Sequence, residues 1–308
     1  MVFACLKAGF AQVWANKRIL LIFYLLNLLL GVVLMLPFRA TLSRHIGNSL
    51  AGEKLGGTID MDLLLEFMMK NSALGGVIVG TGLVVLGIYA LGNLFLSGGA
   101  YGIFISGDKY NAARFWGDAG KYFGRFLRLF LWGVPILIIL FSLQFIVTGV
   151  QKIFWGSDPY EYVPYWGMWL KLGLRAFALF MFFLIYDYGR IYTVKFDEHN
   201  MKKAILAGLR FILKNLRRTV TLAFAFSLLG IIALLIYNPV ADLLSAPNVA
   251  IIILLFLWQQ LFIIFRMMLR LGLYSGQVHL YNELSLPAAP AAPEDMPVSQ
   301  EPEKDMVP

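Results

Sequence analysis

The residue best placed to do chemistry is Asp187, the one acid inside a stretch apolar enough to cross a membrane, 172–194. A carboxylate within a bilayer is costly unless another group compensates its charge. Arg190 follows one helical turn later, so the spacing favours a structural ion pair. A site for a coupling ion or a polar substrate is the alternative that the same two residues allow.

Polar side chains also interrupt the other apolar stretches. With Asp187 and Arg190 they define a candidate intramembrane polar site: Asn27, Asn93, Gln144 and Gln259. Amide side chains in a membrane can contact a polar solute, but they also hydrogen-bond between neighbouring helices and hold them together. The sequence leaves both interpretations open.

No familiar catalytic or metal-binding pattern accompanies these residues. The three histidines, His45, His199 and His279, fall on separate segments, and the expected topology places His45 across the membrane from the other two. Cys5 is the single cysteine, so no intrachain disulfide can form. Serine-nucleophile, phosphate-loop and zinc-protease motifs are missing. We therefore predict no enzymatic activity, no cofactor and no metal ion.

The elements that must position these residues are membrane-spanning helices. Of the 308 residues, 59% are hydrophobic and 14% are charged, against about 25% charged in soluble domains. A spanning helix needs about 20 apolar residues. Five charge-free stretches meet that requirement, and 172–194 is a sixth despite its charges: 19–37, 73–105, 129–150, 219–241 and 243–265.

Basic residues predict the orientation of these spans. With both termini inside, the cytoplasmic segments hold 19 Lys and Arg residues and the outer segments hold 7, and basic residues are retained on the cytoplasmic side. The net charge of +8 then reflects this bias and an attraction to anionic lipids, so no nucleic acid partner is expected. Glycosylation sequons are absent, which fits a bacterial inner membrane.

An amphipathic segment precedes every second span. In 112–126, the apolar stripe that includes Phe115 and Trp116 is flanked by Lys121 and Arg125, a pattern typical of a helix lying in the membrane interface. Similar stripes occur at 2–16 and 201–216. Aligning Gly9, Gly117 and Gly208 divides the chain into three parallel repeats, each an interfacial helix followed by a helical hairpin, at about 1–110, 111–200 and 201–286.

Glycine and proline mark further features. The small-residue pairs Gly76–Gly80 and Gly98–Gly102 lie in the span 73–105 and predict that this span packs closely against another helix. Proline cannot continue a helix without losing a backbone hydrogen bond, so Pro37 is expected to end the first span, and Asn238–Pro239 and Ala246–Pro247 to turn the last hairpin. The tail 287–308 is rich in proline and acidic residues, a composition typical of disorder. The membrane domain is therefore expected to span 1–286.

The segments entering the first and last hairpins are AGFAQVWANKRILLIFYLLNLLL and GLRFILKNLRRTVTLAFAFSLLG. They resemble the membrane domain attached to some bacterial glycerophosphodiesterases and its stand-alone relatives. The resemblance covers these entries only. Because the chain lacks a phosphodiesterase catalytic domain, the resemblance implies a membrane fold and no enzymatic role.

We therefore expect an all-α polytopic membrane protein with six spans in three hairpins and cytoplasmic interfacial helices. The favoured function is a non-enzymatic integral membrane protein that organises or supports a membrane complex through another membrane protein. The alternative is a transporter of a small solute or lipid, with a path between the hairpins. The repeated architecture and Asp187 favour that alternative.

Overall fold

The computed structural model describes residues 1–46, 72–156, 160–244 and 248–285, and all elements in these ranges are helices. They are α1 (Val2–Ala15), α2 (Lys17–Ile46), α5 (Ser72–Ser106), α6 (Ala112–Trp155), α7 (Tyr162–Lys195), α8 (Met201–Lys214), α9 (Leu216–Leu243) and α10 (Val249–Ser285). Six of them, all except α1 and α8, are long and apolar enough to cross a membrane. The chain is thus a multi-pass membrane protein.

Buried side chains concentrate at one end of the helix bundle, where α5, α7 and α10 end and α2, α6 and α9 begin. We call this end the base and the opposite helix ends the tips. The buried residues fall mainly within 96–104, 115–129, 182–193, 201–226 and 267–281. Toward the tips the helices expose apolar side chains, as at Leu83 and Leu235. The base is therefore where the spans are fixed to one another.

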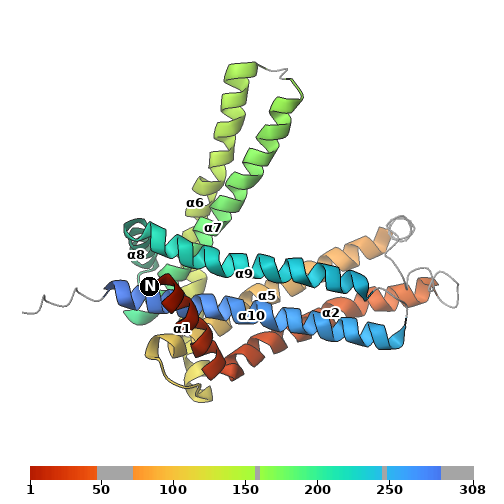
Figure 1. Cartoon of the computed structure of the whole chain (residues 1–308), viewed down its shortest axis with the longest axis horizontal. Coiled ribbons are helices and arrows are strands. Elements are labelled where there is room, and N and C mark those ends of the chain that lie inside the picture. Colours follow the sequence, from red (N-terminus) through yellow and green to blue (C-terminus); the bar gives the residue numbers. More distant parts are fainter. Residues whose placement is uncertain (47–71, 157–159, 245–247, 286–308) are drawn as a thin grey trace, which may run out of the picture.

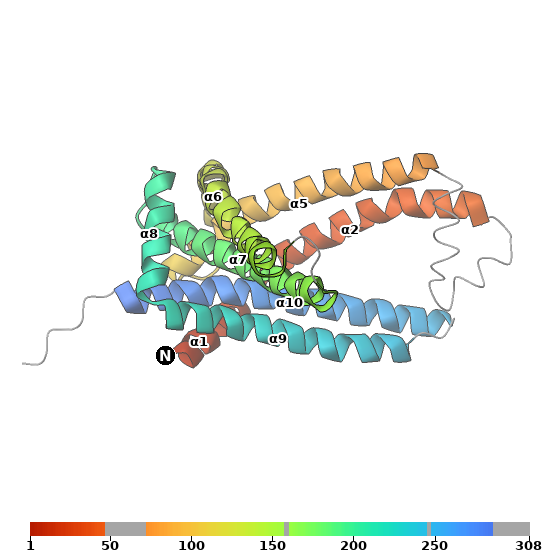
Figure 2. The same ribbon diagram turned by 90° about the horizontal axis from the view of Figure 1, so that it is seen from above.

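The α6–α7 hairpin departs from the direction of the other spans. Helices α2, α5, α9 and α10 run roughly side by side, whereas α6 and α7 project away from them toward their own tips (Figure 1). Viewed from above, α2 and α5 form one pair and α9 and α10 another, with α6 and α7 crossing them (Figure 2). The hairpin is anchored to the rest of the molecule only near the base.

The short helices α1 and α8 lie against the base through glycine. A Cβ atom added to Gly208 of α8 would lie 2.8 Å from the backbone nitrogen of Gly189 in α7. A Cβ atom on Gly9 of α1 would lie 2.5 Å from the carbonyl oxygen of Gly272 in α10. Such distances are too short for any side chain, so both glycines are required for the close approach of their helices.

The beginning of α6 packs against the end of α5 in a related way. Gly98 lies against Ala119, Gly99 lies against Phe115, and a Cβ atom on Gly102 would collide with the side chain of Asp118. Ala119 thus occupies the place that Gly9 and Gly208 hold in the other two contacts. The sequence alignment assigned that place to Gly117, which instead faces open space in the described chain.

The other predicted glycine pair behaves differently. Nothing in the described chain lies within 4 Å of a Cβ atom added to Gly76 or Gly80, whereas Gly98 and Gly102 pack closely on α6. The first pair lies toward the tips and the second at the base. Of these two predicted pairs, only the one at the base therefore mediates close helix packing.

Three expected helix boundaries were wrong. Residues 112–126 form the first part of the continuous helix α6 and not a separate helix. Pro37 lies inside α2 and Pro239 inside α9. A proline removes one backbone hydrogen bond, and local adjustment accommodates that loss in a membrane helix. The predicted turn at Ala246–Pro247 and the predicted tail 287–308 lie outside the described residues.

Candidate functional site

The buried ion pair predicted from sequence is present at the base. The guanidinium of Arg190 pairs with the Asp187 carboxylate one turn earlier on α7, and both residues are nearly inaccessible. The other carboxylate oxygen accepts a hydrogen bond from the Gln277 amide of α10 at 3.4 Å. A buried carboxylate is tolerated when its charge is paired and its oxygens are hydrogen-bonded.

Aromatic rings surround the Arg190 guanidinium. It lies 4.6 Å from the ring centroid of Tyr186, 4.9 Å from those of Tyr101 and Tyr274, and 5.8 Å from that of Phe126. The electron-rich faces of these rings attract a cation. Because the rings belong to α5, α6, α7 and α10, Arg190 connects the projecting hairpin to both neighbouring hairpins. We call Asp187, Arg190, Gln277 and these four rings the Arg190 cluster.

A second arginine extends the cluster toward the tips. Arg270 of α10 donates to the Tyr274 hydroxyl at 2.9 Å and to the Tyr89 hydroxyl of α5 at 3.2 Å. On the opposite side, the Tyr186 hydroxyl donates to the backbone carbonyl of Phe126 at 3.2 Å. These bonds fix the rings around Arg190 and link α5 with α10 and α6 with α7.

Several buried polar atoms of the cluster have no hydrogen-bond partner in the described chain. They are Arg190 Nε, Gln277 Oε1 and the Tyr101 hydroxyl, and the hydroxyl of Tyr188, the residue after Asp187, is also unpaired. Leaving a buried polar group unpaired costs free energy, so such groups mark places for bound water or a small polar ligand. No group of His, Cys, Asp and Glu residues suited to a metal ion occurs in the described ranges.

No family model, curated protein or solved structure matches this chain. Its function must be inferred from its own residues and their arrangement.

The remaining residues of the predicted polar site are not gathered around Asp187. Asn27 donates to the Phe23 carbonyl at 2.7 Å, and Asn93 donates to the Tyr89 carbonyl at 2.8 Å. Gln144 of α6 accepts from Arg175 Nε of α7 at 2.6 Å. Gln259 is exposed on α10. Asn27 also donates to the Met267 sulfur of α10 at 3.3 Å, so the predicted set is divided among separate contacts, some within one helix and some between neighbouring helices.

Sequence reasoning missed the partners of Arg190. Tyr101 and Tyr274 had a signal, since the ends of α5, α7 and α10 each carry a tyrosine next to a small residue in AYG, DYG and LYS. Arg270 and Gln277 were overlooked because the last span was expected to stop at residue 265, while α10 continues to Ser285. Polar residues beyond that boundary were treated as lying outside the membrane.

A second charged group lies at the surface of the base. Lys121 and Arg125 of α6 both pair with Asp197, in the connection after α7, at 3.0 and 2.7 Å. Hydrogen bonds from these two cations lower the pKa of Asp197 from 3.8 to about 2. These basic residues, predicted to face lipid headgroups, hold the loop that leads into α8. Phe115, nearer the start of α6, is buried against Gly99 of α5, and Trp116 is half-exposed.

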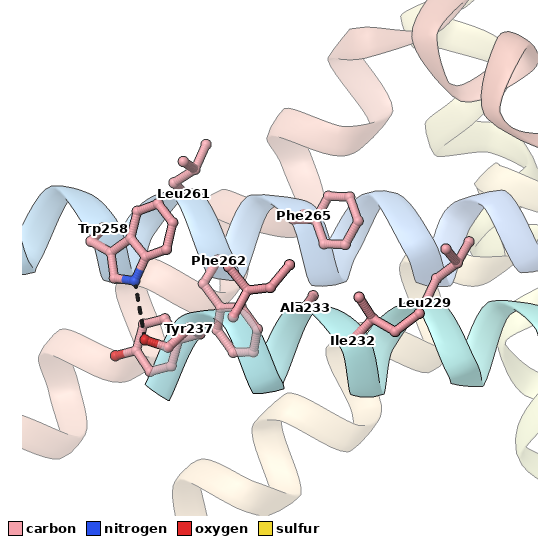
Figure 3. Close-up of a pocket in the computed structure, with 9 residues that line it drawn as sticks. Leu229, Ile232, Ala233, Tyr237, Trp258, Leu261, Phe262 and Phe265 are labelled. Carbon is pink, nitrogen blue, oxygen red and sulfur yellow. Dashed lines mark hydrogen bonds between the residues drawn. The ribbon is translucent and has the colours of Figure 1, made fainter. Parts of the chain in front are cut away.

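Among the apolar grooves on the flanks of the helices, two involve α9. One, of about 330 Å³, lies between α9 and α10 and is bordered by Phe262 and Phe265. Among its lining residues, the Trp258 indole donates a hydrogen bond to the Tyr237 carbonyl at 3.3 Å (Figure 3). The other, of about 600 Å³, lies between the α6–α7 hairpin and the helices α8 and α9, and Arg217 is its one charged lining residue.

Proposed function

We propose that this chain is a non-enzymatic integral membrane protein that supports a membrane complex, and that its α6–α7 hairpin binds a transmembrane helix of a partner. The single observation that carries the proposal is the position of Arg175. This arginine lies on the projecting hairpin, and its side chain is exposed near the middle of a membrane-spanning helix.

The depth of Arg175 follows from helix geometry. It lies thirteen residues after Tyr162, where α7 begins, and twelve before Asp187 at the base. At ~1.5 Å per residue, it is about 18–20 Å along the helix from either point. An arginine at such a depth is costly when it faces lipid. Its one side-chain partner in the described chain is the neutral Gln144 amide, so its charge is left uncompensated.

The surroundings of Arg175 leave room for another helix. Successive residues on a helix point about 100° apart, so two adjacent exposed residues lie on different faces. On α6, Ile138 and the adjacent Ile139 are 63% and 65% exposed, and Phe145 and the adjacent Ile146 are 67% and 61% exposed. More than one face of α6 is therefore free. A partner helix bearing a carboxylate would cover this surface and neutralise the arginine, an arrangement common for charges within membranes.

The proposed placement of the chain is a bacterial inner membrane with three parallel hairpins and both termini cytoplasmic. The basic-residue bias supports this orientation. The repeat is supported by the contacts at the base, because each entry segment packs on the end of the preceding hairpin and α1 packs on α10. In a Cys5→Ser background, a cysteine replacing Tyr160 should react with an impermeant thiol reagent from outside. One replacing Asn200 should react only after the membrane is opened, and the reverse pattern would exclude this orientation.

Site-specific photo-crosslinking tests the proposed partner contact. Leu172 and Leu179 flank Arg175 on its own face of α7 and are both exposed. A crosslinker at either position should give a discrete protein adduct in native membranes, and Arg175→Gln should remove it. Lys171→Gln serves as the control for a nearby charge. Adducts with lipid alone, or a protein adduct that survives Arg175→Gln, would contradict the proposal.

A transporter is the second candidate function, and the Arg190 cluster favours it. The cluster joins three hairpins and contains unpaired buried polar atoms, which is where a solute path between repeats would run. Flux of a small polar solute in proteoliposomes, abolished by Asp187→Asn in a folded variant, would replace the proposal above. Absence of flux with retained partner crosslinking would favour the complex subunit.

A further inference from the structure

We propose that the groove between the α6–α7 hairpin and the helices α8 and α9 binds an anionic phospholipid, with its headgroup phosphate at Arg217 and an acyl chain in the groove. The groove is distinct from the face that carries Arg175 and from the Arg190 cluster. It measures about 600 Å³, and α6, α7, α8 and α9 all contribute to its wall.

The lining of the groove fits a hydrocarbon chain. Its length is bordered by apolar side chains, among them Leu140, Phe177, Met181, Leu209 and Val220. The one lining hydroxyl, on Thr221, donates to the backbone carbonyl of Arg217 and is already satisfied. A polar solute would find no hydrogen-bonding group along this wall, whereas an acyl chain needs none.

The mouth of the groove fits an anionic headgroup. Arg217 is exposed at the beginning of α9, and no carboxylate in the described chain pairs with its guanidinium. An arginine fork matches phosphate oxygens in geometry and charge. Residues 201–221 hold six basic residues and no acid, and one of the six, Lys203, pairs with Glu198, so the segment around Arg217 has a positive net charge. Each basic residue near an anionic membrane adds attraction of about 1 kcal/mol.

The mouth of the groove also lies at the level expected for lipid headgroups. Lys202 of α8 lies 4.2 Å from the ring centroid of Trp132 on α6, and tryptophan and lysine pairs of this kind occur at the level of lipid headgroups. Arg217 lies in the first turn of α9, at the same base of the bundle. The α9–α10 groove provides the contrast, because its lining has no charged residue (Figure 3) and so selects no headgroup.

Lipid retention by the full chain, measured by native mass spectrometry, tests the site. The protein is released from phosphatidylcholine bilayers containing phosphatidylglycerol, and the retained lipids are compared. We expect selective retention of phosphatidylglycerol, weakened about ten-fold by Arg217→Gln, as for one lost charge-assisted hydrogen bond. Arg210→Gln is the matched control, since Arg210 is also exposed on this basic surface but does not line the groove.

Filling the groove provides the second arm of the test. Val220→Trp should displace the acyl chain and reduce retention of phosphatidylglycerol while leaving every basic residue in place. Equal losses with Arg217→Gln and Arg210→Gln would show general surface attraction and overturn the site. Retention unaffected by Arg217→Gln or Val220→Trp would do the same. A protein crosslinked from Leu213 and not displaced by phosphatidylglycerol would assign the groove to a partner helix instead.

Discussion

The entries to the first and last hairpins bend, and the entry to the second does not. Asn16 ends α1 and Asn215 ends α8, and each amide donates to the carbonyl four residues earlier, at 2.9 and 3.1 Å. Their backbone angles nearly coincide, with φ, ψ of −115°, 45° and −125°, 31°. The contacts at the base place Phe126 at the matching position of α6, seven residues after Ala119, and there the helix continues unbroken.

The difference shows that the entry helix ends at an asparagine in two hairpins and continues through a phenylalanine in the third. At both asparagines the backbone angles leave the α-helical region, so the helix ends and the following span can start in a new direction. The side-chain amide shares the carbonyl that the asparagine's own backbone N–H already bonds. Phenylalanine offers no such bond. Phe126 is fully buried beside Tyr101, and α6 keeps the direction of its first turns. This explains why the α6–α7 hairpin projects from the other spans (Figure 1).

The largest expected effect comes from breaking the Arg190 cluster, which holds the unbent helix to its neighbours. Arg190→Met leaves Asp187 buried without its partner, a change that typically costs about 3–5 kcal/mol. The double variant Asp187→Leu with Arg190→Met removes both charges and should recover most of that loss. The fraction of monodisperse protein remaining after heating in detergent measures both variants. A double variant as unstable as the single one would show that the ion pair is not the source of the effect.

The next largest effect compares the same added methyl group in a bent entry, at Gly208 of α8, and in the unbent entry, at Gly117 of α6. Gly208→Ala forces α8 away from Gly189 and should destabilise the protein by about 1–3 kcal/mol. Gly117→Ala introduces the same methyl group into open space and should stabilise α6 by up to about 1 kcal/mol through helix propensity. The same heating assay compares them. Equal stabilities would mean that α8 does not depend on its close approach to α7.

Features of the fold and of the candidate site that depend on residues close together in the sequence could be predicted, whereas contacts between separate helices could not. The six spans were predicted because lipid requires continuous apolar stretches, and the Asp187–Arg190 pair because its two members lie on one turn. Ala119 was missed as the partner of Gly98 because composition allows several alignments, and Gly117 gave the closer match. The rings around Arg190 come from four helices, and local spacing contains no information on which helices meet.

A smaller effect is expected from the bend itself. Asn215→Ala removes the amide bond to Phe211, worth about 1 kcal/mol, and allows α8 to continue into α9. Spin labels replacing the exposed residues Leu206 and Leu228 should then show a second population near the ~33 Å expected for 22 residues of straight helix. Pulsed electron resonance measures the distance, and Lys214→Ala is the control. A distribution identical to that of the unsubstituted protein would place the cause of the bend in packing and not in the asparagine.

The smallest effect concerns the tether that holds the unbent helix to the loop after α7. Asp197 adopts a left-handed conformation with φ of 48°, and Lys121 and Arg125 lower its pKa from 3.8 to about 2. A carboxylate whose pKa is lower in the folded protein adds stability above its unfolded pKa. That stability is lost as the pH falls from about 4 to about 2. The side chain is 53% exposed, so solvent screening keeps the contribution small.

Asn tolerates the same backbone conformation; Asp197→Asn should therefore remove this part of the pH dependence without straining the loop. Thermal unfolding between pH 5 and pH 2.5 measures it, with Asp242→Asn as the control. If the melting temperatures of the unsubstituted protein and of Asp197→Asn change in parallel through this pH range, Asp197 is not paired in the folded protein. The unbent helix α6 is then held by the Arg190 cluster and α5 alone.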